Sequence, residues 1–223
     1  MDTPIADAPI APEAFLRANT ALSRARLCPD IALHLATEIT PIWQATESWL
    51  RETNTEPPFW AFAWPGSEAL ARHIRDHPAL VAGKRVLDFA AGCGLAAIAC
   101  VQAGAAAVDA AEIDPLAIAA IALNAAENHV RINAFGEDVV GSPCRWDVIL
   151  CGDVCYEAPM TAHILPWLRN CSARAEVWVA DPGRAYLPRS GMIEQARYTV
   201  PTTVELEDRT ERTVTLYRLR QEK

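Results

Sequence analysis

Two acidic side chains flank a glycine-bearing turn near the middle of the chain and could together hold a nucleoside. Asp88 lies in the apolar run 86–89, which leads into Gly92 and Gly94. Glycine permits the tight turn and the close backbone approach that a bound ligand needs. Glu112 comes 18 residues after Gly94, at the end of the next predicted strand, where a carboxylate can accept hydrogen bonds from both ribose hydroxyls. The glycines alone would fit an ordinary turn, but the second acid favours a nucleoside site.

The chemistry of this turn distinguishes between two nucleosides. The pattern G-x-G-x-x-A, with Gly92 and Gly94 as its glycines, also fits a dinucleotide site. Asp88, however, would repel a pyrophosphate, whereas it would attract the ammonium and sulfonium groups of S-adenosylmethionine. The chain has no Tyr-x-x-x-Lys for hydride transfer, because Lys84 and Lys223 are its only lysines. We therefore predict S-adenosylmethionine as the cofactor, with an NAD-type oxidoreductase as the alternative.

A second pair of residues follows the apolar run 146–151. Asp153 could orient an amine nucleophile, and the ring of Tyr156 could face a cation. Because a carboxylate raises the pKa of a nearby amine, we assign Asp153 to positioning rather than to strong general-base work. Two plainer interpretations stay open, in which Asp153 caps the helix that follows and Tyr156 only packs.

Aromatic and acidic residues elsewhere also have two interpretations each. Trp60 and Trp64 lie four residues apart, so they could form one face of a buried helical turn or offer their rings to a cation. Asp138 could meet an adenine amino group or lie on the surface. Asp114 precedes Pro115 and is predicted to cap the next helix.

The elements that would position these residues alternate between strand and helix from residue 83 onward. The predicted strands are 86–89, 106–113, 146–151 and 177–180, and the predicted helices are 95–103, 115–128 and 162–170. This alternation predicts an α/β, Rossmann-like, mostly parallel sheet with helices on both faces. The tail alternates apolar and polar residues over 195–206 and 212–220, which predicts a C-terminal antiparallel hairpin.

The N-terminal third is read as an extension of one domain that spans residues 13–223. Residues 1–12 are predicted to be a flexible lead-in, and 13–37 carry apolar residues at helical spacing, with a new helical turn at Pro29. Residues 39–50 fit a strand or a helix, and 51–58 a polar loop. We divide the domain into a helical, substrate-side extension over 13–82 and a cofactor-binding core over 83–223.

The composition excludes several classes of function. The net charge of −8 gives no basic surface for nucleic acid, and no apolar run reaches the roughly 20 residues of a membrane helix. The acidic N-terminus lacks a secretory or mitochondrial pattern, which predicts a cytoplasmic protein. Seven scattered cysteines without a CxxC pair, and histidines without ligand spacing, predict free, mostly buried thiols and no metal site.

Three segments together carry a family resemblance. They are PFWAFAWPGS at 58–67, the loop at 88–94 and DVCYE at 153–157. They resemble the class I, seven-strand protein-lysine methyltransferases, and most of all the branch that modifies the electron transfer flavoprotein β subunit, over residues 38–220. The resemblance implies a seven-stranded sheet, S-adenosylmethionine as methyl donor and a protein-lysine substrate. The implied cofactor contacts are Asp88, Gly92, Gly94, Glu112, Trp64, Gly66 and Asp153, and the implied lysine-channel residues are Asp153 and Tyr156.

The chain departs from this family pattern at one position and leaves alternative targets open. Ala90 stands where the family has glycine, and since alanine resists positive φ, the loop needs a negative φ at this residue to form without strain. The site at 153–156 has no prolines, which disfavours amide and base substrates. The alternatives are a methyltransferase of another protein such as a ribosomal protein, the oxidoreductase, and a non-catalytic binding module. We expect a monomer that meets a protein substrate and neither nucleic acid nor membrane.

Overall fold

A seven-stranded sheet forms the centre of the molecule. The computed structural model describes residues 11–37, 42 and 58–220, and within them the strand order is β5-β4-β3-β6-β7-β9-β8. The strands are β3 (Arg85–Phe89), β4 (Ala107–Ala111), β5 (Asn133–Phe135), β6 (Val148–Gly152), β7 (Glu176–Asp181), β8 (Met192–Pro201) and β9 (Glu211–Leu219). Strands β3 to β7 are parallel, whereas β9 is antiparallel to both β7 and β8. The predicted Rossmann-like fold and its C-terminal hairpin are confirmed.

Helices cover both faces of this sheet because its central strands are apolar on both sides. Val86 and Val148 pack in one core with residues of α3 (Pro65–Asp76), α4 (Leu95–Gln102) and α5 (Pro115–Glu127). Leu87 and Ile149 pack in a second core with α6 (Ala158–Cys171). Continuous apolar strands with helices on both faces are typical of parallel sheets. The three core helices that we predicted are therefore present, and α3 is a further one that we did not predict.

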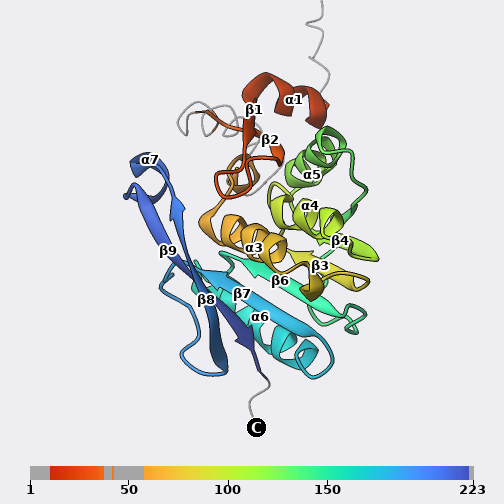
Figure 1. The fold of residues 1–223 in the computed structure, drawn as a ribbon, viewed down its shortest axis with the longest axis vertical. Coiled ribbons are helices and arrows are strands. Elements are labelled where there is room, and N and C mark those ends of the chain that lie inside the picture. Colours follow the sequence, from red (N-terminus) through yellow and green to blue (C-terminus); the bar gives the residue numbers. More distant parts are fainter. Residues whose placement is uncertain (1–10, 38–41, 43–57, 221–223) are drawn as a thin grey trace, which may run out of the picture.

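The C-terminal hairpin reaches past the parallel part of the sheet. A short helix, α7 (Val204–Glu207), lies at its tip between β8 and β9. Figure 1 shows that this tip points toward the end of the molecule where the N-terminal elements lie, while the other end of the hairpin lies at the opposite end of the molecule. The hairpin therefore brings residues from the end of the chain toward the edge of the sheet where β6 and β7 finish.

The N-terminal segment differs from our prediction of helix over 13–37. Only α1 (Pro12–Asn19) is helical, and β1 (Ala21–Arg24) pairs with β2 (Ala32–Leu35) in an antiparallel ladder. Tertiary hydrogen bonds override the helical spacing here, because the side chains of Asn124 in α5 and of Asn128, the C-cap residue of α5, bind the backbone of β2. The segment at Pro29 is a turn rather than a new helix, closed by the Ile31 N–H bond to the Cys28 carbonyl.

Some predicted segments fall outside the described part of the chain. Residues 1–10 of the expected lead-in, all of 39–50 except Ile42, and 51–57 of the expected loop lie outside the described residues. Two 3₁₀ helices, η1 (Phe59–Ala61) and η2 (Pro78–Leu80), flank α3. Among the described residues, no helix has both the length and the apolar character needed to cross a bilayer.

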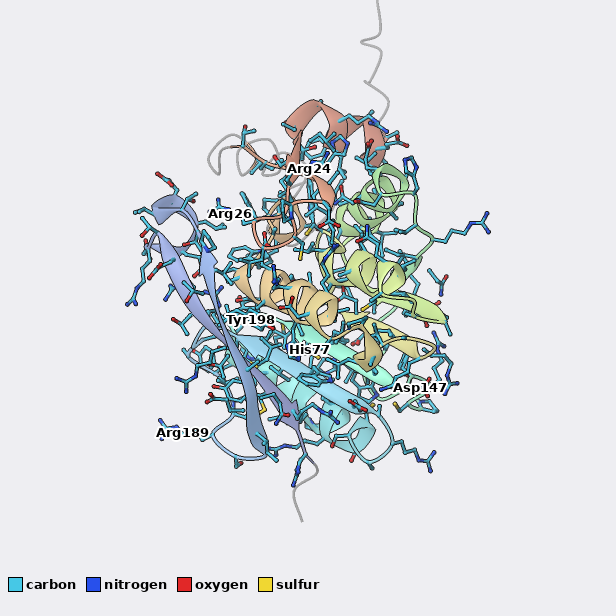
Figure 2. All side chains as sticks on the ribbon, in the orientation of Figure 1. Arg24, Arg26, His77, Asp147, Arg189 and Tyr198 are labelled. Atoms are coloured by element: carbon cyan, nitrogen blue, oxygen red, sulfur yellow. The ribbon has the colours of Figure 1, made fainter. Side chains whose placement is uncertain are left out.

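The two edges of the parallel sheet differ in what they carry. At the edge where β3 and β6 begin, Asp147, which is labelled in Figure 2, pairs with Arg85. At the other edge, β3 leads into the glycine turn and β6 leads into Asp153. Strand order reverses between β3 and β6, and ligands of such sheets bind beyond the carboxyl ends at this switch point. The fold therefore places both candidate motifs at one crevice.

Candidate active site

A cavity of about 640 Å³ opens at the carboxyl ends of β3, β4 and β6. Of the predicted site residues, Trp64, Gly92, Glu112, Asp153 and Tyr156 line it. The other three predicted residues, Gly66, Asp88 and Gly94, do not line it. This volume suits a ligand of nucleoside size, since small-molecule sites commonly measure roughly 300–1,000 Å³.

The turn after β3 contains three residues with left-handed backbone. Ala90 has φ +54°, Gly92 has φ +55° and Gly94 has φ +78°. Ala90 therefore does not keep the negative φ that alanine favours, and a left-handed alanine costs on the order of 1–2 kcal/mol. The turn is held from both sides, by the Ala91 N–H bond to the Ala111 carbonyl (3.3 Å) and by the Gly94 N–H bond to the Ala91 carbonyl (2.8 Å).

Asp88 faces the helix that follows the turn. Its Oδ2 accepts the backbone N–H of Ala97 at 2.9 Å, and the side chain is buried. Burial raises the pKa of this carboxyl to about 8, and the nearby charge of Glu112 adds to the rise. The structure thus places Asp88 beneath the turn, where it fixes the first turn of α4.

Glu112 lies on the cavity wall and is bound to the turn. Its Oε1 accepts the N–H of Gly92 at 2.8 Å, and its Oε2 accepts the N–H of Ile113 at 3.1 Å. Burial raises the pKa of this carboxyl to about 7. Each carboxylate oxygen has a further lone pair, so Glu112 can still accept from two hydroxyls. The exposed apolar side chain of Ile113 continues the wall beside it.

The two aspartates that follow β4 and β5 have different positions. Asp114 accepts the N–H of Leu116 at 2.8 Å, so the predicted cap at the start of α5 is confirmed. Asp138 lines the cavity while its two oxygens bind the N–H of Val140 and the ring of His163, both at 2.9 Å. Asp138 is thus an exposed residue on the cavity rim.

Asp153 occupies the end of β6 in a left-handed conformation, with φ +58°. The interpretation that it caps the helix after it is wrong, because α6 begins at Ala158 and its N-cap residue is Glu157. Its Oδ2 instead accepts the N–H of Gly66, in the first turn of α3. Burial raises the pKa of Asp153 to about 6, and the positive charge of Arg184 opposes that rise.

Gly66 is where α3 comes closest to β6 and β7. A Cβ at this position would lie 2.5 Å from Asp153 Oδ2, 2.7 Å from the Asp153 nitrogen and 2.7 Å from the Ala180 carbonyl oxygen. Only glycine permits this approach. Gly66 therefore influences the cavity indirectly, by holding Asp153, and does not line the wall itself.

Arg184, which sequence reasoning missed, joins Asp153 to the C-terminal hairpin. Its Nε and Nη2 donate to Asp153 Oδ1 at 2.9 and 2.7 Å. Its Nη1 and Nη2 also donate to the two oxygens of Glu207 in α7, at 3.1 and 2.5 Å. Arg212 of β9 binds the same carboxylate at 2.8 Å. Arg184 lies 31 positions from Asp153 and 23 positions from Glu207, so no local sequence motif indicates that they meet.

Aromatic rings form the third side of the cavity. Phe59 lies between Trp64 and Tyr156, with ring centroids 5.8 and 5.4 Å away in edge-on geometry. Trp60 and Trp64 do not share one helical turn, because Trp60 lies in η1 and Trp64 is the N-cap residue of α3. The interpretation of Trp60 as a core residue is confirmed, because its side chain is buried. Phe59 is a further cavity residue that the sequence analysis did not single out.

The cysteines and histidines of the described residues form no metal centre. All seven cysteines are free and only Cys144 is not buried, as predicted. Within the described ranges, no cluster of three or more His, Cys, Asp or Glu side chains could hold a metal ion. The polar and aromatic side chains that line the cavity include carboxylates, aromatic rings, the imidazole of His163 and the guanidinium of Arg184.

Known proteins resemble this chain in sequence and in fold. A model of the ribosomal protein L11 methyltransferase family matches residues 75–154, which run from α3 to just beyond β6. Two solved structures, a proposed RNA methyltransferase of Pyrococcus horikoshii (18% identical, TM-score 0.54) and a protein of Thermoplasma acidophilum (17%, 0.51), share the fold. The match covers 73% and 70% of this chain, and 88% of each structure.

Closer relatives share the sequence over most of its length. The electron transfer flavoprotein beta subunit lysine methyltransferase of Xenopus laevis is 38% identical over 179 residues, which are 78% of this chain and 71% of that protein. The Danio rerio protein of the same name is 33% identical over 204 residues, 87% of this chain and 78% of the relative. The human protein is 37% identical, over 77% of this chain and 66% of its own length. The chain belongs to the family of electron transfer flavoprotein beta subunit lysine methyltransferases.

Proposed function

We propose that this chain transfers a methyl group from S-adenosylmethionine to lysine side chains on the β subunit of electron transfer flavoprotein. One observation carries the proposal. In a chain of this family, one cavity is lined by Asp153 and Tyr156, which follow β6, and by Gly92 and Glu112, which follow β3 and β4. A methyl donor held by Gly92 and Glu112 would thus share this cavity with an amine beside Asp153.

The walls of the cavity fit S-adenosylmethionine. Glu112 supplies an acceptor for two ribose hydroxyls, and the apolar Ile113 beside it suits the face of an adenine. Gly92 supplies a turn without a side chain, which Asp88 supports from below through Ala97. When bound, this cofactor supplies a methyl group already activated by a sulfonium, so the protein mainly has to align donor and acceptor.

The other wall fits a lysine amine. With a free pKa of about 10.4, only about one lysine in 2,500 is neutral at pH 7, which corresponds to roughly 4.6 kcal/mol. The rings of Phe59, Trp64 and Tyr156 partly remove water from the amine, and desolvation lowers the pKa of a lysine. Asp153 would orient the amine, because its carboxylate is held in place by Gly66 and Arg184.

The target is tested with purified proteins. Unmethylated electron transfer flavoprotein, made in a host without this activity, is incubated with the chain and tritiated S-adenosylmethionine. We expect label on lysines of the β subunit, located by mass spectrometry, and its loss with Asp153→Asn. Ribosomal protein L11 is the matched second substrate, because the model of its methyltransferase family matches residues 75–154 of this chain. Label on L11 and none on the β subunit would refute the proposed target.

A further inference from the structure

We propose that Arg184 is a positioning residue that lets Asp153 orient the target lysine without keeping that lysine protonated. The inference rests on the proposed function and concerns the same cavity. It starts from a conflict in that function. A carboxylate beside an amine steers it into place, but it also stabilises the ammonium form, which has no lone pair for attack.

The geometry shows how Arg184 resolves this conflict. Its guanidinium donates twice to Asp153 Oδ1, while Oδ2 is bound to Gly66. Asp153 is only 7% exposed, and a buried carboxylate without a partner is strongly destabilised. Arg184 supplies the partner from within the protein, so Asp153 does not need the cation of an incoming lysine.

The charges around the cavity make Arg184 distinctive. Among the described residues, it is the one arginine or lysine that lines the wall. The other ionisable groups on the wall, apart from the cysteine and tyrosine, are Glu112, Asp114, Glu137, Asp138, Asp153, Glu157 and His163. Without Arg184 the wall would be almost entirely acidic, and an acidic wall holds a lysine as its ammonium.

Groups behind the wall hold Arg184 in place. Glu207 binds its outer side and is itself bound by Arg212, so two carboxylates and two guanidiniums alternate in one network. Asp181 at the end of β7 faces Arg184 from below and accepts its backbone N–H at 2.6 Å. Trp64 lies against the guanidinium, with the ring centroid 5.8 Å from its carbon. The guanidinium therefore has little freedom to leave Asp153.

The order of proton and methyl transfer follows from this arrangement. The lysine ammonium first releases its proton to water, while Asp153 remains paired with Arg184. The nitrogen lone pair then forms the new bond to the methyl carbon as the carbon–sulfur bond breaks and its electron pair passes to sulfur. The nitrogen becomes a methylated ammonium, and the sulfonium becomes a neutral thioether. Without Arg184, the first step would leave a buried, unpaired carboxylate, so it would occur only at higher pH.

The test is the pH dependence of kcat for lysine methylation by the full-length protein with saturating S-adenosylmethionine. Arg184→Gln keeps a hydrogen-bond donor but removes the charge. We expect the midpoint of its profile, the pH at which kcat is half of its maximum, to rise by at least one pH unit. At pH 7.5, kcat should be at least tenfold lower than that of wild type, and the affinity for S-adenosylmethionine should stay within threefold of wild type. Arg184→Lys keeps the charge and should restore the midpoint to within about half a unit. Arg197→Met, an exposed change on β8 of the same hairpin, is the control.

A second variant is expected to shift the midpoint of the kcat profile in the opposite direction, and it leaves Arg184 unchanged. Glu207→Gln removes the negative charge on the outer side of Arg184, so the midpoint should move to lower pH. A kcat of Arg184→Gln that falls by the same factor at every pH would overturn the inference, as would an upward shift in Glu207→Gln. If the wild type does not methylate lysine in this assay, the proposed function fails. If it does and the profile of Arg184→Gln overlays it, only the role of Arg184 fails.

Discussion

The backbone N–H of Gly92 donates to Glu112 Oε1 over 2.8 Å, so the turn after β3 and the acid after β4 form one unit. Asp88 also supports the turn, because its carboxylate accepts the backbone N–H of Ala97 at the start of α4. A ligand that meets this wall therefore finds its acceptor already oriented, and little conformational freedom is lost on binding.

Glu112→Gln should weaken the binding of S-adenosylmethionine about 10- to 100-fold, because a hydrogen bond to a charged group contributes about 1.5–3 kcal/mol. Glutamine keeps an acceptor for Gly92 but replaces the oxygen that accepts from Ile113 with an NH2 group. Because the same change removes a buried charge, the melting temperature of the ligand-free protein should change little. Isothermal titration calorimetry measures the affinity. Glu137→Gln, which removes another acid from the cavity wall, is the matched control and should bind nearly as tightly as wild type. Equal affinity of all three proteins would contradict the role of Glu112.

The stability of the ligand-free protein should fall as the pH rises from about 4 to about 8. Burial raises the pKa of Asp88 from 3.8 to about 8 and that of Glu112 from 4.5 to about 7. The folded state thus binds these protons more tightly than the unfolded state, and the stability they contribute at low pH is lost through this window. Each group contributes at most about 1.4 kcal/mol per pH unit.

Asp88→Asn tests this pH dependence directly. Asparagine keeps an acceptor for Ala97 but has no charge to bury, so its stability curve should be flatter and should lie above that of wild type at pH 8.5. Urea denaturation at pH 5.5, 7 and 8.5 gives the free energies of unfolding. Parallel curves for the two proteins would show that Asp88 does not titrate in this range.

Ala90→Gly should leave the free energy of unfolding unchanged or raise it by up to about 1.6 kcal/mol. Glycine removes the strain of φ +54°, which is on the order of 1–2 kcal/mol, while it adds freedom to the unfolded chain, about 0.4–1 kcal/mol. Ala91→Gly, at the next and nearly buried position, has no such strain to relieve and should lower stability by about 0.5–1 kcal/mol. Guanidinium denaturation compares the two, and an equal loss in both would argue against strain at Ala90.

Gly66→Ala should abolish methyl transfer and lower stability by about 2–4 kcal/mol, in the range of severe core substitutions. The added Cβ would lie 2.5 Å from Asp153 Oδ2 and 2.7 Å from the Ala180 carbonyl, so α3 must move away from β6. Gly136→Ala is the control, because the nearest atom to its Cβ would be the Glu112 carbonyl at 3.8 Å. Turnover and thermal melting are measured for both. Full activity in Gly66→Ala would show that Asp153 tolerates a shift of α3.

The alternation of strands and helices was enough to predict the core of the fold. Runs such as 86–89 are too short and too apolar for an exposed helix, and Gly94 and Pro115 mark where helices begin. The N-terminal hairpin was not predictable in this way, because its strands depend on Asn124 and Asn128, about 90 residues away. The positive φ of Ala90 likewise follows from its neighbours, not from its own preference.

The candidate site was predictable only where its residues follow strands in sequence. Glu112 and Asp153 each end a strand, and parallel strands bring such ends to one edge. Arg184 and Glu207 meet Asp153 through a loop and a hairpin tip, and no spacing rule connects them. Gly66 resembles any helix-starting glycine until the distance to Asp153 is known.

Glu207 comes after both Glu112 and Arg184 in the sequence, and this order has a consequence for synthesis on the ribosome. The strands that carry the turn and Glu112 emerge early, and Arg184 emerges before its outer partner. Until α7 and β9 have left the exit tunnel, the Arg184 guanidinium cannot donate the hydrogen bonds to Glu207 that hold it against Asp153. A nascent or C-terminally shortened chain would therefore complete its nucleoside-binding wall first and its amine-handling wall last.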